Sequence, residues 1–122
     1  MTTEALAAAG LNPTGLVGGR VGAWQGNLRA GGDQLFVVEA DEYDRSFLAL
    51  TPTVAVVTNM EADHLDTFAD LEDIRRAFGQ FVSPARQVVI CADDRGASTV
   101  DLTTGADRVT YGVAGGEARV VA

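Results

Sequence analysis

Two short apolar runs, each leading directly into acidic residues, constrain the fold of this chain most. The first run is Leu35–Val38 and continues as Glu39-Ala40-Asp41-Glu42. The second is Val54–Val57, which continues through Thr58-Asn59 to Glu61-Ala62-Asp63-His64. Uninterrupted apolar runs of this length predict strands buried on both faces, as in a parallel sheet covered by helices.

The segments around these runs alternate between helical and extended patterns. Asp70 is a good N-cap for a helix to about Phe81, and apolar residues recur along one face of that helix at Leu71, Ile74, Phe78 and Phe81. Further helices are expected over residues 2–9, ending at Gly10, and over residues 93–102. Further strands are expected at 14–17, 87–91, 108–111 and 118–121, and residues 21–33 should form a Gly-rich loop. The expected fold class is α/β, with a mostly parallel sheet flanked by helices.

Composition and charge exclude several classes of protein. The net charge is −8, all nine basic residues are arginines, and no basic stripe suited to nucleic acid is present. No apolar run approaches the roughly 18 residues that span a bilayer, and the N-terminus does not resemble a signal peptide. The single cysteine, Cys91, excludes an internal disulfide framework. We therefore expect a cytoplasmic protein.

The acidic strand exits predict a ligand site. Ligands of open parallel sheets bind beyond the carboxyl ends of the strands, so neighbouring strands would bring Glu39 and His64 to one rim. Carboxylates and an imidazole there could hold a divalent cation such as magnesium. The alternative is that these acids only cap helices and line solvated loops, and that His64 is structural. Acidic residues follow both apolar runs, and this repetition favours the functional interpretation.

Both acidic segments resemble motifs of the Mur ligases, the ATP-dependent amide-forming enzymes of peptidoglycan synthesis. The matching segments are Glu39-Ala40-Asp41-Glu42 and Thr58-Asn59 followed by Asp63-His64-Leu65-Asp66. Further resemblance covers Gly18-Gly19, Gly26-Asn27 and the turn at residues 91–94. The resemblance is greatest to the branch that joins L-alanine to UDP-N-acetylmuramate. It implies that residues 1–122 are part of the family's central ATPase domain, with a truncated P-loop-NTPase-like fold.

The resemblance also implies roles for individual residues. Glu39 and His64 would be catalytic and would bind magnesium, and His64 could instead orient the substrate carboxylate. Asn59 and Asp63 would lie beside the cofactor, and Asn27 would contact the nucleotide-sugar substrate. From the residues alone, Asn27 could equally be a plain turn residue and Asp63 a helix cap.

One family motif is missing from this sequence. Mur ligases carry a Gly-rich phosphate loop whose lysine reaches the β- and γ-phosphates of ATP, and this chain contains no lysine. The expected enzyme would also need an N-terminal nucleotide-sugar domain and a C-terminal domain. We therefore expect the isolated chain to be inactive. Three alternatives stay open: the ligase for recycled murein tripeptide, which Tyr43 favours, a degenerate binding domain without catalysis, and a metal-dependent phosphohydrolase.

Overall fold

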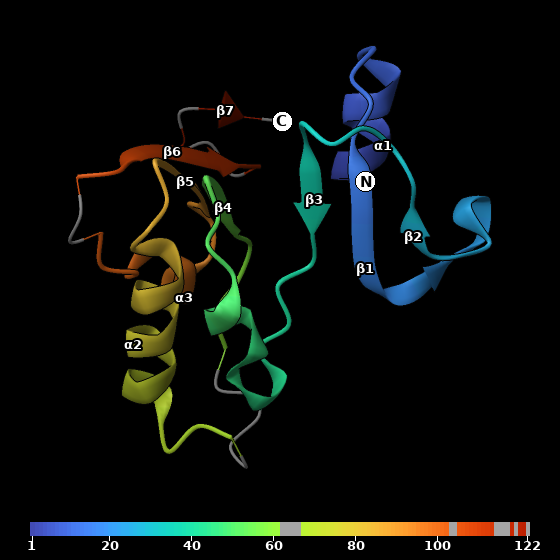
Figure 1. The fold of residues 1–122 in the computed structure, drawn as a ribbon. Helices are drawn as coiled ribbons and strands as arrows, with labels where there is room; N and C mark the ends of the chain where they lie inside the picture. The colour runs from blue at the N-terminus through green and yellow to red at the C-terminus, as the bar shows by residue number, and fades with distance from the viewer. Residues whose placement is uncertain (62–66, 103–104, 114–117, 119, 122) are drawn as a thin grey trace. The chain divides into compact units, whose positions relative to one another are not determined.

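The computed structural model describes residues 1–61, 67–102, 105–113, 118 and 120–121. Two compact units make up the chain, one over residues 1–41 and the other over residues 42–122. Each unit contains its own β-sheet (Figure 1). None of the helices in these residue ranges is long and apolar enough to cross a membrane.

The first unit contains a three-stranded sheet in the order β2-β1-β3. Helix α1 (Thr2–Ala8) precedes strand β1 (Thr14–Val21), a 3-10 turn η1 (Gly22–Trp24), strand β2 (Gly26–Arg29) and strand β3 (Phe36–Val38). Strand β1 pairs antiparallel with β2 and parallel with β3. Part of the segment expected to be a loop is therefore the strand β2. The helix ends as expected, because Gly10 adopts a φ of 83°, which favours glycine.

The second unit contains a four-stranded, wholly parallel sheet in the order β4-β5-β6-β7. Its strands are β4 (Val54–Val57), β5 (Gln87–Cys91), β6 (Asp107–Gly112) and β7 (Val120–Val121). Its helical elements are η2 (Tyr43–Ala49), α2 (Leu71–Val82) and α3 (Arg95–Ser98). This parallel sheet with its helices confirms the α/β class and most of the predicted element positions.

The core of the second unit lies on one face of its sheet. Ala55 is paired with Val88 and Val57 with Ile90, and all four side chains are buried. Helix α2 begins as predicted, because the Asp70 carboxylate accepts the N–H of Asp73 at 2.8 Å. The helix contributes buried apolar side chains, and Phe47 of η2 packs on the rings of two of its residues. The α2 residues concerned are Ile74, Ala77, Phe81 and Val82 in the core, and Phe78 and Phe81 against Phe47.

Within their own units, the two apolar runs are not buried on both faces as predicted. In β3, Phe36 and Val38 are 61% and 42% exposed, and in β4, Val54 and Val56 are 50% and 52% exposed, so each strand has only one covered face. Strand β3 pairs with β1 and strand β4 pairs with β5, and because the two strands belong to different units, their predicted pairing with each other stays a prediction. An apolar run predicts a strand, but neither its partner nor the layer that covers it can be inferred from the run.

Candidate functional site

Glu39, the predicted metal ligand, follows β3 directly and is held by strand β1. Its backbone N–H donates to the Leu16 carbonyl oxygen at 2.9 Å, so the strand pairing continues into Glu39. Its carboxylate Oε2 accepts the backbone N–H of Gly18 at 3.0 Å. The residue is exposed, so the contact with Gly18 orients the carboxylate at the end of the strand without burying it.

This arrangement suits a hard cation held by one carboxylate. Magnesium usually keeps several waters and takes only one or two protein carboxylates together with substrate phosphates. Glu39 is an exposed carboxylate with one oxygen already oriented, which fits that mode. Among the residues that the structure describes, no three acidic, histidine or cysteine side chains form a ready-made metal cage.

The other predicted site residues lie at different places in the chain. Asn27 is an exposed residue of strand β2, so it is not in the predicted loop. Asn59 comes two residues after β4 and is exposed, and its Oδ1 accepts the Thr58 hydroxyl at 3.0 Å. Asp63 and His64 lie outside the described residues. Because Glu39 belongs to the first unit and Asn59 to the second, the common rim of Glu39 and His64 stays a prediction.

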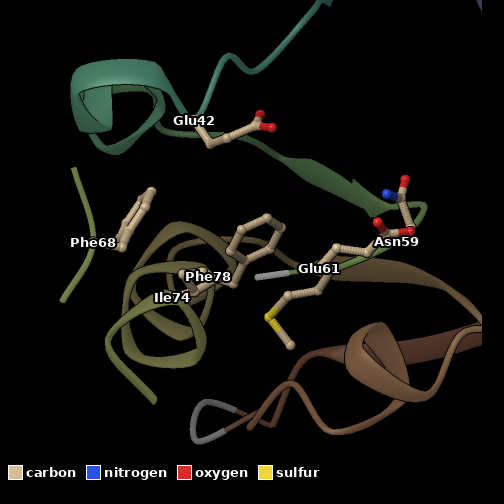
Figure 2. Close-up of a pocket in the computed structure, with 7 residues that line it drawn as sticks. Glu42, Asn59, Glu61, Phe68, Ile74 and Phe78 are labelled. Atoms are coloured by element: carbon tan, nitrogen blue, oxygen red, sulfur yellow. The ribbon is translucent and has the colours of Figure 1, made fainter. Parts of the chain in front are cut away.

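A small cavity of about 80 Å³ opens beside the exit of β4 (Figure 2). Its polar lining consists of the carboxylates of Glu42 and Glu61 and the amide of Asn59. Its apolar lining comes mainly from α2 and the segment before it, namely Phe68, Ile74 and Phe78, together with Met60. Asn59 is therefore the one described residue of the predicted site that lines this cavity.

The backbone just after β4 is held by Asp94, which the sequence analysis had placed in a turn and at the start of an expected helix but had not assigned a role. The Asp94 carboxylate caps α3 by accepting the Ala97 N–H at 2.6 Å. The same oxygen accepts the N–H of Met60 at 3.1 Å. Gly96 packs against Met60, and a Cβ there would lie 3.0 Å from the Met60 carbonyl carbon. Helix α3 thus fixes the residue immediately after Asn59.

A second polar cluster holds the backbone at Thr67–Ala69. The Arg45 guanidinium forms an ion pair with Asp73, donates to the Thr67 carbonyl oxygen at 3.3 Å and lies 4.8 Å from the centre of the Phe68 ring. Asp73 in turn accepts the Ala69 N–H at 3.2 Å. The hydrogen bond from Arg45, followed by the one from Ala69, holds the pKa of Asp73 below its ordinary value.

Arg45 reaches this cluster from an unusual backbone conformation. Asp44 and Arg45 have φ values of 52° and 55°, both in the left-handed region. For residues other than glycine, such conformations cost on the order of 1–3 kcal/mol each and persist only where the surroundings enforce them. The contacts of the Arg45 side chain supply that enforcement.

Comparison with known proteins identifies the family. The sequence profile of the Mur ligase middle domain matches residues 25–122. The chain belongs to the Mur ligase middle-domain family. The motifs at Glu39 and at Thr58-Asn59 both fall within the matched range.

Two relatives and one solved structure that resemble the chain are all UDP-N-acetylmuramate–alanine ligases. The chain is 43% identical to the UDP-N-acetylmuramate–L-alanine ligase of Rubrobacter xylanophilus over 98% of its own length, and 46% identical to that of Frankia alni over 82%. The crystal structure of the UDP-N-acetylmuramate–alanine ligase from Thermotoga maritima matches 88% of the chain with a TM-score of 0.70 and 29% identity. The chain spans between about a fifth and about a quarter of the length of these relatives: 27% of the Rubrobacter protein, 18% of the Frankia protein and 24% of the Thermotoga chain.

The residues that sequence reasoning missed act through contacts distant in the chain. Arg45 and Asp73 are 28 residues apart, and Met60 and Asp94 are 34 residues apart. For Asp94 a usable signal existed, because Asp three residues before Ala97 is a common N-cap pattern. For Arg45 no local pattern marks either its backbone conformation or its partner.

Proposed function

We propose that residues 1–122 are part of the central ATP-binding domain of a ligase that joins L-alanine to UDP-N-acetylmuramate in the cytoplasm. The observation that carries the proposal is the 43% identity to such a ligase over nearly the whole chain. The family match and the two acidic motifs support the same function.

The proposed reaction forms an amide at the expense of ATP. The carboxylate of UDP-N-acetylmuramate attacks the γ-phosphorus of ATP, releasing ADP and forming an acyl phosphate. The amine of L-alanine then attacks the acyl carbon, phosphate leaves, and the amine loses a proton. Charge accumulates on crowded phosphate and carboxylate oxygens, so the main task of the site is to position and neutralise them.

The chain would contribute specific groups to that task. Glu39 would hold a magnesium ion, and its exposed carboxylate, oriented by the Gly18 amide, is suited to that role. Magnesium would supply neutralisation of phosphate charge. His64 would bind a second ion or orient the substrate carboxylate. Asn59 and Asp63 would lie beside the cofactor, and Asn27 would contact the nucleotide sugar.

A chimeric ligase tests the proposal. In it, residues 1–122 replace the matching part of the Rubrobacter xylanophilus relative, and formation of UDP-N-acetylmuramoyl-L-alanine is measured with ATP and magnesium. We expect turnover with L-alanine and none with murein tripeptide as the amine, which separates this ligase from the tripeptide ligase. The isolated chain should release no phosphate from ATP, because it has no lysine to serve a phosphate loop.

Substitutions in the chimera test the residue roles. Glu39→Gln keeps the shape of the side chain but removes the charge, and should lower kcat about 100-fold, the scale of losing one key electrostatic contact. His64→Ala should lower kcat similarly. Glu72→Gln, which changes an exposed carboxylate on α2 paired with Arg75, is the matched control and should keep normal kcat. Normal kcat in both site variants, or a folded chimera without turnover, would reject the assignment.

A further inference from the structure

We propose that Arg45 is a positioning residue for the proposed ligase: it fixes the backbone at Thr67–Ala69 and so holds Phe68 in the wall of the cavity that Asn59 also lines. The inference rests on the proposed function for its catalytic consequence. Its structural part depends only on the contacts of residues 42–122.

The contacts of Arg45 converge on three residues before helix α2, Thr67–Ala69. One guanidinium bonds to the Thr67 carbonyl oxygen, pairs with Asp73 and covers the Phe68 ring. Asp73 holds the Ala69 N–H from the other side. Three consecutive residues are therefore attached, directly or through Asp73, to a side chain that comes from η2.

The backbone of Arg45 indicates that this attachment matters to the fold. Two consecutive non-glycine residues, Asp44 and Arg45, occupy the left-handed region. Strained conformations of this kind concentrate where a side chain must be aimed for function. Here the strained residue is the one whose side chain reaches Thr67 and Asp73.

A second residue of the cavity wall, Met60, is fixed by an independent contact. Asp94 binds the Met60 N–H, and Met60 and Phe68 both line the cavity beside Asn59. Met60 and Phe68 are thus each held by a charged side chain from elsewhere in the unit. Loss of Arg45 would release Phe68 and leave Met60 attached.

Kinetics of the chimera test the catalytic consequence. We expect Arg45→Ala to lower kcat about 10-fold with little change in the KM for L-alanine, the scale seen when groups that orient metal-site ligands are lost. Arg45→Lys should recover only part of the rate, because an ammonium cannot reproduce the planar fork of a guanidinium. Arg75→Ala removes another arginine of the same unit, paired with Glu72, and should leave kcat unchanged.

A double-variant cycle identifies the partner. If Arg45 acts through Asp73, then Arg45→Ala combined with Asp73→Asn should lose no more kcat than the worse single variant. A thermal melt of each variant accompanies the kinetics. Equal kcat losses in Arg45→Ala and Arg75→Ala, or a lower Tm with unchanged kcat in Arg45→Ala, would overturn the positioning role.

Amide hydrogen exchange of the 122-residue chain separates this proposal from the proposed function. Arg45→Ala should speed exchange of the Ala69 amide at least about 5-fold while the Met60 amide, held by Asp94, exchanges at its former rate. If the unmodified chimera makes no product, the ligase assignment fails, and the exchange result still decides whether Arg45 positions Thr67–Ala69. Unchanged Ala69 exchange would refute the positioning proposal even in an active ligase.

Discussion

Replacing Gly96 by Ala should destabilise the protein although Gly96 lies in a helix. A Cβ at this position would lie 3.0 Å from the carbonyl carbon and 3.1 Å from the Cβ of Met60, and closer still to the carbonyl oxygen. Two of these three atoms are backbone, so no rotamer change removes the overlap. Overpacking of this kind costs about 1–3 kcal/mol, whereas the helical preference of Ala over Gly gains at most about 1 kcal/mol. We expect the free energy of unfolding of Gly96→Ala to be about 1–2 kcal/mol lower than that of the parent.

Gly79 of α2 is the matched control for Gly96. A Cβ at Gly79 would lie 3.9 Å from the Asp101 carbonyl oxygen, an ordinary contact, so Gly79→Ala should stabilise by about 0.5–1 kcal/mol. Urea denaturation of both variants gives the free energies of unfolding, and thermal melts should show a fall of about 4–16 °C for Gly96→Ala. Helix preference alone predicts the same sign for both variants. A Gly96→Ala variant as stable as the parent would refute the reasoning about Met60.

Two further predictions concern the second unit. The pKa of Asp73 is lower in the folded chain than its ordinary value of 3.8, so ionised Asp73 stabilises the fold at pH values above 3.8. This stabilisation is lost as the pH falls through the lower pKa of the folded state. Urea denaturation between pH 5 and about pH 2.5 should therefore show that the free energy of unfolding falls more steeply with decreasing pH for the parent than for Asp73→Asn. Ile90 is 0% exposed, so Ile90→Ala should cost about 2–5 kcal/mol in the free energy of unfolding. Val54→Ala, at a half-exposed site of the neighbouring strand, should cost less than about 1 kcal/mol, and equal losses at both sites would contradict the one-faced core.

Features that depend on residues near one another in the chain could be predicted well. Asp70 caps α2 because a carboxylate three residues before an N–H satisfies a group that the first helical turn leaves open. Gly10 ends α1 because it tolerates positive φ. The strands at Val54–Val57 and Gln87–Cys91 follow from apolar runs bounded by polar residues.

Features that depend on partners elsewhere in the chain could not be predicted in this way. The run at Leu35–Val38 does not specify that β1 is one of its partners, and this pairing was not predicted. Strand β2 was missed because Gly26-Asn27-Leu28-Arg29 has little β preference of its own and extends by pairing with β1. The exposure of Phe36 depends on which elements cover the sheet, which its own sequence cannot specify.

The same division separates the chemistry of the candidate site from its positioning. Glu39 directly follows an apolar run and Asn59 comes two residues after one, so the predicted site residues Glu39 and Asn59 could be proposed from short stretches of consecutive residues and their resemblance to family motifs. Asp94 contacts Met60 and Arg45 contacts Thr67 across many residues of the chain, and no local pattern marks either contact. An acidic strand exit therefore indicates where a ligand could bind, whereas the rigidity that a phosphoryl-transfer site needs comes from contacts that become visible only in the fold. Variants at Glu39 and at Arg45 should accordingly differ in kind: the first removes a charge from the proposed site, whereas the second keeps that charge and loosens the backbone at Thr67–Ala69.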